Sequence, residues 1–127
     1  MFAYETERAP LYVLRFVGRF TAADERVYLA TLEDLLHRPP GFALVVVLQN
    51  ENRMSADGNK QQALWFKQNR NWLGEICRGM VRVREHEPDH HHDTSNFRKA
   101  MPFPTTEVET EAEGIAWALA RLEEAGR

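Results

Sequence analysis

The alternation of apolar and polar residues along the chain predicts a series of strands and helices. Its most apolar run is residues 42–48, Phe-Ala-Leu-Val-Val-Val-Leu, and the polar stretch 49–58 follows directly. A continuous run of this kind, rich in β-branched residues, is typical of a strand buried on both faces. We therefore expect residues 42–48 at the centre of a sheet, with the polar stretch connecting that strand to a helix.

Two shorter apolar segments precede this strand, at residues 2–5 and 11–17, and a five-residue turn joins them. Two strands that are connected in this way predict a β-hairpin. Thr21 is a suitable N-cap for the helix that follows, with Asp24 three residues later in an acidic variant of the capping box. The apolar stripe of that helix is Tyr28, Leu32, Leu35 and Leu36.

The second half of the chain continues the alternation of helices and strands. The predicted elements are a helix from about residue 55 to 73 or 76, a strand 78–86, a short helix within 94–101, a strand 105–109 and a final helix capped by Thr110. Strands that alternate with helices favour parallel pairing through right-handed crossovers. The sequence predicts an α/β fold with a mixed central sheet of about five strands, an opening hairpin and three to four helices, all in a single domain spanning residues 1–127.

Composition narrows the class of protein. The 127 residues are 43% hydrophobic and 28% charged, with a net charge of −3. Such a chain is expected to be globular, and a nucleic-acid partner is disfavoured because those partners usually require a basic surface. No apolar run approaches the roughly 20 residues of a membrane helix, and no secretory signal is visible. With Cys77 as its single cysteine, the chain is predicted to be cytoplasmic, with no membrane or nucleic-acid partner.

Three segments carry a resemblance to a known family. They are the hairpin exit 17–21 (Val-Gly-Arg-Phe-Thr), the apolar strand 43–48, and the start of the last helix, 111–117 (Glu-Ala-Glu-Gly-Ile-Ala-Trp). Together with the order of elements, they resemble the STAS domain, in particular the SpoIIAA-like group of stand-alone bacterial proteins. This resemblance implies a module that acts by binding a protein partner rather than by catalysis.

The resemblance also points to one loop. In the anti-anti-sigma members of the family, the loop after the central strand carries a serine that an anti-sigma kinase phosphorylates, beside an aspartate and a glycine. The corresponding residues here are 54–58, Met-Ser-Ala-Asp-Gly. If the glycines are matched, Ala56 occupies the phospho-acceptor position and Ser55 is one residue away. We predict partner-binding residues Asn52, Arg53, Ser55 and Asp57; the alternative is a polar connection in which Ser55 or Asp57 caps the next helix.

A histidine cluster is the second candidate site. His86, His90, His91 and His92 lie close to Glu87, Asp89 and Asp93, and imidazole with carboxylate is a ligand set that zinc, nickel or copper accepts. The alternative is a solvated loop that binds metal only adventitiously. The chain has no G-x-S-x-G, P-loop or G-x-G-x-x-G motif, so we predict no catalytic residues and no cofactor.

Several alternatives stay open at this stage. The alternative to a protein-interaction module is a small-molecule or lipid carrier with a pocket between sheet and helix. Trp65, Phe66 and Trp72 recur at helical spacing, which favours core packing over a pocket lining. The basic residues Arg78, Arg82, Arg84, Arg98 and Lys99 belong either to an anion-binding patch or to a solvated face, and their acidic neighbours favour the solvated face. A homodimer is possible through Trp117 or the strand 78–86.

Overall fold

The computed structural model of the chain describes residues 1–49, 54–84 and 101–125. Five strands form one sheet in the order β1-β2-β3-β4-β5. Their bounds are β1 Phe2–Glu5, β2 Leu11–Val17, β3 Phe42–Gln49, β4 Cys77–Arg84 and β5 Thr105–Val108. β1 pairs antiparallel with β2, and every other neighbouring pair is parallel. The mixed sheet with its opening hairpin is thus confirmed, and the apolar run is the central strand.

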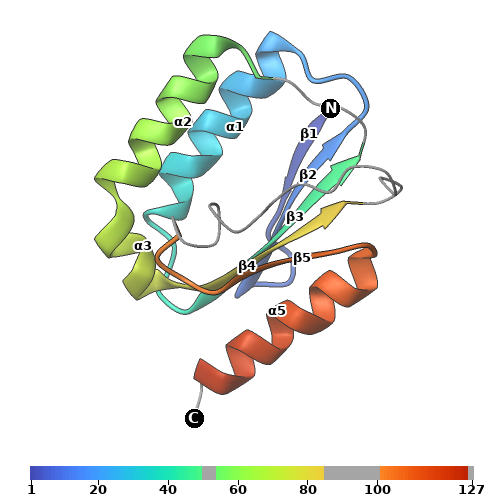
Figure 1. Ribbon diagram of the computed structural model, residues 1–127, viewed down its shortest axis with the longest axis vertical. Coiled ribbons are helices and arrows are strands. Elements are labelled where there is room, and N and C mark those ends of the chain that lie inside the picture. The colour runs from blue at the N-terminus through green and yellow to red at the C-terminus, as the bar shows by residue number, and fades with distance from the viewer. Residues whose placement is uncertain (50–53, 85–100, 126–127) are drawn as a thin grey trace.

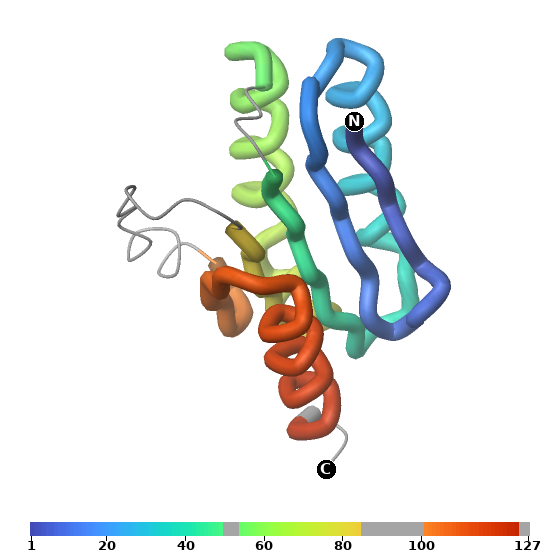
Figure 2. The backbone as a smooth tube through the Cα atoms, turned by 90° about the vertical axis from the view of Figure 1, so that its right-hand side faces the viewer, coloured from blue at the N-terminus to red at the C-terminus, as the bar shows by residue number. Residues whose placement is uncertain are grey.

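The helices lie on both faces of this sheet, unequally. Those in the described ranges are α1 Ala22–Leu35, α2 Ala56–Gln68, α3 Arg70–Ile76 and α5 Glu111–Ala125. Figure 1 shows α1, α2 and α3 together on one side of the sheet and α5 alone on the other. In Figure 2, α5 lies in front of β3 and β4, whereas the β1–β2 hairpin extends past it. None of the helices in this described part is long and apolar enough to cross a membrane.

The single helix predicted between residues 55 and 76 is two helices. The break is at Asn69, whose backbone has φ −111° and ψ 14°, outside the helical range. The Asn69 side-chain amide donates to the Trp65 carbonyl at 2.8 Å. An asparagine side chain that binds local backbone in this way competes with helix continuation. Sequence periodicity alone missed the break because apolar positions continue on both sides of it.

The capping box predicted at Thr21 is present, and Thr110 caps the last helix as predicted. The Thr21 hydroxyl accepts from the Asp24 N–H at 3.1 Å, and the Asp24 carboxylate accepts from the Thr21 N–H at 2.9 Å. Asp24 also accepts from the backbone N–H of Phe2 at 3.2 Å, which attaches the start of α1 to β1. At α5, the Thr110 hydroxyl accepts from the Glu113 N–H at 3.2 Å.

The strands divide their side chains between two cores. The core under α1, α2 and α3 is built mainly from aromatic and long aliphatic residues, among them Tyr12, Leu14, Phe16, Phe42, Leu44 and Met80. The core under α5 is built from smaller residues, among them Val13, Ala43, Val45, Val47, Val81, Val83 and Ala118. The predicted strand at residues 78–86 corresponds to β4, whose Val81 and Val83 face α5. β4 is one strand in from the edge, between β3 and β5.

Candidate functional site

Ser55 begins α2 and is held by α1. Its hydroxyl oxygen accepts from the Gly58 N–H at 2.9 Å, which makes Ser55 the N-cap. Its hydroxyl and its backbone N–H both donate to the carboxylate of Glu25 on α1, at 2.9 and 2.8 Å. The side chain of Ser55 therefore fixes the start of α2. Ser55 caps this helix, which is the alternative to a partner contact that the sequence left open.

Gly58 is required for this arrangement. A Cβ atom added at this position would overlap the Glu25 carboxylate. A larger residue at position 58 would push the Glu25 carboxylate away from Ser55. Asp57 lies beside this glycine, is exposed, and accepts from the side chain of Gln61 at 2.6 Å. Of the two predicted contact residues that the structure describes, Ser55 joins α1 to α2. Asp57, in the first turn of α2, faces solvent and does not contact α1 in the bonds described above.

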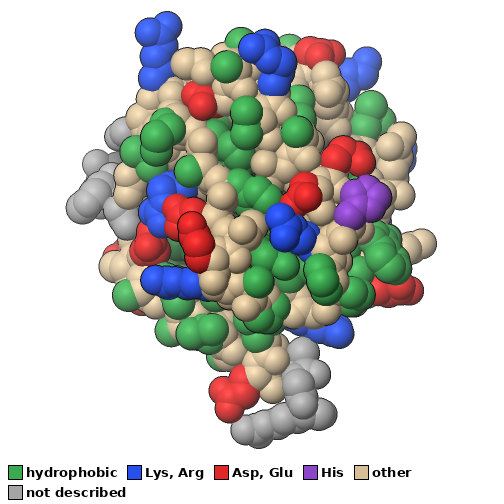
Figure 3. All heavy atoms as spheres, turned by 180° about the vertical axis from the view of Figure 1, so that it is seen from behind, with side chains coloured by type: hydrophobic (Ala, Val, Ile, Leu, Met, Phe, Trp, Pro, Cys, Tyr) green, Lys and Arg blue, Asp and Glu red, His purple; other side chains and the backbone are tan. Residues whose placement is uncertain are grey.

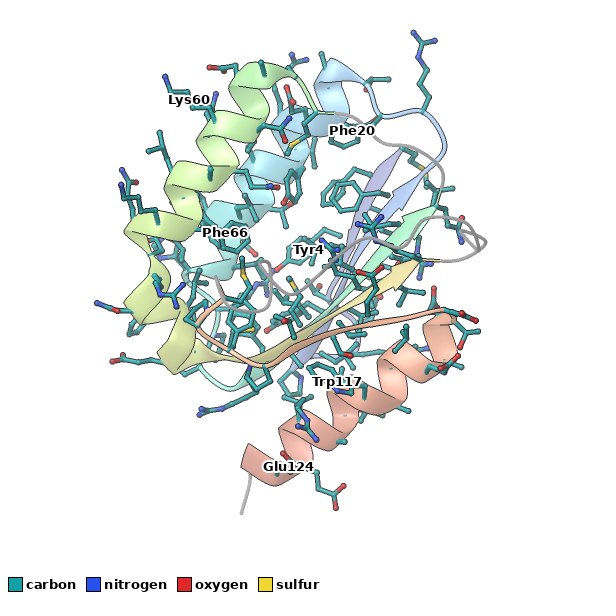
Figure 4. All side chains as sticks on the ribbon, viewed as in Figure 1. Tyr4, Phe20, Lys60, Phe66, Trp117 and Glu124 are labelled. Carbon is teal, nitrogen blue, oxygen red and sulfur yellow. The ribbon has the colours of Figure 1, made fainter. Side chains whose placement is uncertain are left out.

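A cavity of about 250 Å³ opens next to this helix start, between the carboxyl ends of β2, β3 and β4 and the helices α1 and α2. We call it the outer cavity. Apolar side chains form most of its wall: Phe16, Phe20, Tyr28, Val46, Leu48, Met54, Phe66 and Met80. Figure 4 shows Phe20 and Phe66 on the same side of the sheet, while Lys60 projects from the outer side of α2. In open α/β sheets, this end of the strands is where ligands bind.

Three polar side chains also line the outer cavity: Asn59, Gln62 and Arg82. The Oε1 atom of Gln62 accepts a hydrogen bond from the Tyr28 hydroxyl. Burial raises the pKa of Tyr28 above its usual range, so Tyr28 stays a neutral donor. The Asn59 amide donates to the Met54 carbonyl at 3.4 Å. Both amides belong to α2, so this helix carries two of the three polar groups.

Among the described residues that line the outer cavity, the charged one is Arg82. Its guanidinium donates to Glu107 of β5 at 2.8 Å, and Arg84 forms an ion pair with the same carboxylate at 3.0 Å. All three side chains are less than a quarter exposed. Two guanidinium groups share one carboxylate, so these three side chains are together net positive. Arg82 and Arg84 are thus both paired with an acidic neighbour, and both side chains are mostly buried.

A smaller cavity of about 40 Å³ lies deeper, and we call it the inner cavity. It shares Tyr28, Val46, Phe66 and Met80 with the outer cavity. Its remaining wall is apolar apart from the indole of Trp65, whose buried Nε1 has no acceptor among the described residues. Trp65 and Phe66 therefore combine the two roles considered for them, because they pack in the core and line cavities. Trp72 is half-exposed on α3 and donates to the Leu36 carbonyl at 3.1 Å.

Asn52 and Arg53, and the histidines His86, His90, His91 and His92, lie outside the described residues. Within the described ranges, no group of three or more His, Cys, Asp or Glu is placed to hold a metal ion. Cys77 is buried, and burial raises the pKa of its thiol to about 12, so it is not a thiolate near neutral pH.

Both elements considered for a homodimer take part in packing within the fold. The strand β4 lies between β3 and β5 in the sheet. The Trp117 ring packs on the backbone of Gly79, and the Arg121 guanidinium lies 5.3 Å from the ring centre. Figure 4 shows Trp117 between α5 and the sheet, so this ring belongs largely to the packing of α5. On the face shown in Figure 3, the apolar side chains of the described residues are interleaved with acidic and basic ones. A homodimer stays a prediction.

Sequence reasoning missed most of the cavity wall. From the sequence, Tyr28 is expected in the apolar stripe of its helix and Phe20 stands only within the motif 17–21, whereas no role is assigned to Phe16 or Met80. The available signal was the concentration of aromatic residues at the carboxyl ends of β2 and β3, which periodicity does not separate from ordinary packing.

Comparisons with known proteins agree on the fold. No protein-family model and no curated protein matches the sequence. Among solved structures, an uncharacterized protein of the DUF3478 family with a SpoIIAA-like fold, from Shewanella loihica, superposes with a TM-score of 0.64 at 13% identity. That match covers 93% of this chain and 92% of the other. An anti-sigma factor antagonist from Mycobacterium paratuberculosis superposes with a TM-score of 0.55 at 15% identity, over 94% and 93% of the two chains. The chain therefore has the SpoIIAA-like fold that its sequence resembles.

Proposed function

We propose that this protein is a non-catalytic interaction module that binds a protein partner through the first turns of α2. The observation that carries this proposal is the clamp of Glu25 on Ser55, which fixes the start of α2 while Asp57 and Lys60 stay exposed. A preformed surface of this kind binds at a lower entropic cost than a flexible one. Similarity to an anti-sigma factor antagonist, a protein named for a regulatory interaction, supports the same function.

Charge reversal at this surface tests the proposal. The variant Asp57→Lys/Lys60→Glu keeps the net charge and leaves Ser55 and Glu25 in place. The matched control, Glu33→Lys/Lys67→Glu, changes exposed residues of the same types on α1 and at the far end of α2. A partner captured from the source cell should bind the wild type and the control and lose at least tenfold in affinity for the first variant. Equal binding of both variants, with unchanged melting temperatures, would remove this surface from consideration.

A second function, carriage of a small molecule, has an observation of its own. The outer cavity is mostly apolar with a few convergent polar groups, which is the usual composition of a ligand site. Its volume of about 250 Å³ suits a small ligand rather than a whole lipid. Native mass spectrometry of freshly purified protein tests this function. A bound molecule that disappears in a variant with a filled cavity, Met80→Trp, would support it.

A further inference from the structure

We propose that the outer cavity binds a small two-ring aromatic molecule, held among the aromatic rings and methionine side chains of its wall. This inference rests on the carrier function proposed above and names the class of ligand. A free small molecule is meant, not a side chain of a protein partner.

The volume of the outer cavity sets the size of the ligand. An engineered apolar cavity of about 150 Å³ binds benzene, which is a single ring of six heavy atoms. By proportion, the outer cavity at about 250 Å³ has space for about ten heavy atoms. Two fused aromatic rings have that size.

Aromatic rings from four parts of the chain meet at the outer cavity. Between ring centres, Phe16 of β2 lies 5.6 Å from Phe20 of the following loop and 5.1 Å from Tyr28 of α1. Both pairs are inclined, with interplanar angles of 51° and 71°, and Phe66 lines the same cavity from α2. Rings in such arrangements attract one another beyond the area that they bury. A flat aromatic ligand extends this set of contacts, whereas a saturated ligand of the same size does not.

Two of these rings are only partly buried. Phe20 and Phe66 pack against the core beneath α1 and α2 and remain partly exposed. Phe16 and Tyr28, in contrast, are almost completely buried. Phe20 and Phe66 therefore have ring surface left for a ligand, and Figure 4 shows both on the side of the sheet that α1 and α2 cover.

Methionine side chains add to the wall that suits an aromatic ligand. Met54 and Met80 both line the outer cavity. A thioether sulfur makes favourable contacts with ring edges, and the flexible side chain adjusts to the outline of a ligand. The amides of Asn59 and Gln62 line the same cavity, so a hydroxyl group on the ligand also has hydrogen-bonding groups within reach of the wall.

Two probes with the same carbon skeleton test the class of ligand. 2-Naphthol has two fused aromatic rings and a hydroxyl group, and decahydro-2-naphthol is its saturated counterpart. With ¹³C-methyl methionine, 2-naphthol should shift the Met54 and Met80 signals saturably and leave Met1, which is exposed at the N-terminus, unchanged. Decahydro-2-naphthol should bind at least fivefold more weakly. That ratio corresponds to about 1 kcal/mol, the contribution of an aromatic pair beyond its buried area.

A double variant separates ring contacts from burial alone. Phe20→Leu/Phe66→Leu keeps apolar side chains in the wall and removes both partly buried rings. We expect its affinity for 2-naphthol to fall at least fivefold, so that the preference for 2-naphthol over the saturated probe disappears. Phe42→Leu is the matched control, because it removes a ring from the same core at a residue that lines neither cavity. This control should keep the preference, and melting temperatures check that both variants are folded.

The outcomes distinguish failure of the inference from failure of the carrier function. If the two probes bind equally tightly to the wild type, or if the double variant keeps the preference, the aromatic class is wrong while the carrier function stands. A co-purified molecule without an aromatic ring has the same meaning. If 2-naphthol also shifts Met1, or still shifts Met54 when Met80→Trp fills the cavity, the assignment to the outer cavity is wrong. If neither probe shifts Met54 or Met80 and no molecule co-purifies, the carrier function itself fails.

Discussion

The two faces of the sheet are packed in different ways by residues of the same strands. Facing α5, β3 and β4 present Val45, Val47, Val81 and Val83, which are fully buried. The α5 helix approaches them so closely that a Cβ on its Gly114 would lie 2.7 Å from a methyl carbon of Val83. Facing α1 and α2, the same strands present larger side chains, and both cavities described above lie on that face.

This difference shows how one sheet can provide stability on one face and binding on the other. Small β-branched side chains form an even surface on which a helix with glycine at the contact can lie close. Aromatic rings and methionines hold α1 and α2 farther from the strands and fill the space between incompletely. We infer that the α5 face tolerates almost no added volume, whereas the α1 face accepts it, and the predictions below test that difference.

The largest effect is expected at the contact between α5 and the sheet. Gly114→Val would place side-chain atoms against Val83, with Val45 and Val108 also near, so neither helix nor strand can relax cheaply. We expect a loss of about 3 kcal/mol of unfolding free energy, at the upper end for overpacked cores. Urea unfolding measures this loss.

The control for this variant lies two residues along the same helix. Ala116 is exposed, so Ala116→Val changes helix propensity by about 0.6 kcal/mol or less and adds no contact with the sheet. Combining Gly114→Val with Val83→Ala should recover part of the loss, because the second change removes the methyl groups that clash. Equal losses for Gly114→Val and Ala116→Val would contradict the close approach of α5.

A matched pair of substitutions on β3 compares the two faces directly. Val46 lines both cavities, and its neighbour Val47 is fully buried under α5. Val47→Ile should cost about 1 kcal/mol through overpacking, whereas Val46→Ile should be neutral or stabilise by up to about 0.8 kcal/mol, the value of one buried methylene. Thermal and urea unfolding of both variants give the comparison. If the two substitutions lower the free energy of unfolding equally, the two faces do not differ in their tolerance of added volume.

This unequal tolerance was only partly predictable from the sequence. The central strand, the hairpin, the Thr21 capping box and the Thr110 cap follow from local patterns, because burial on both faces and capping residues leave direct marks in the residue order. The division of β3 into a small face and a larger face is also visible, since Ala43, Val45 and Val47 alternate with Phe42, Leu44, Val46 and Leu48, of which Val46 alone is small.

The cavity and the clamp were not predictable in the same way. The contact of Glu25 with Ser55 joins residues 30 positions apart, and no local pattern in the sequence encodes such a pairing. The cavity depends on how closely large side chains interlock, and a list of apolar positions does not contain that information. The prediction of one continuous helix through Asn69 failed for a simpler reason. The break accompanies one side-chain hydrogen bond, which lies inside an otherwise continuous helical pattern.

The smallest effect on stability is expected when acid protonates Asp24, the residue that attaches α1 to β1. Hydrogen bonds from the Thr21 N–H, the Thr21 hydroxyl and the Phe2 N–H lower the pKa of Asp24 from its usual value of 3.8 to about 2. Because the folded pKa lies below the unfolded one, the stabilisation by Asp24 is fully present above about pH 4 and is lost as the pH falls toward about 2. Asp24→Asn should therefore be less stable than the wild type at pH 6, and the two should converge at pH 2. Urea unfolding at pH 6, 4 and 2 measures this difference. A difference that stays constant over that range would mean that Asp24 attaches α1 to the hairpin through its shape and not through its charge.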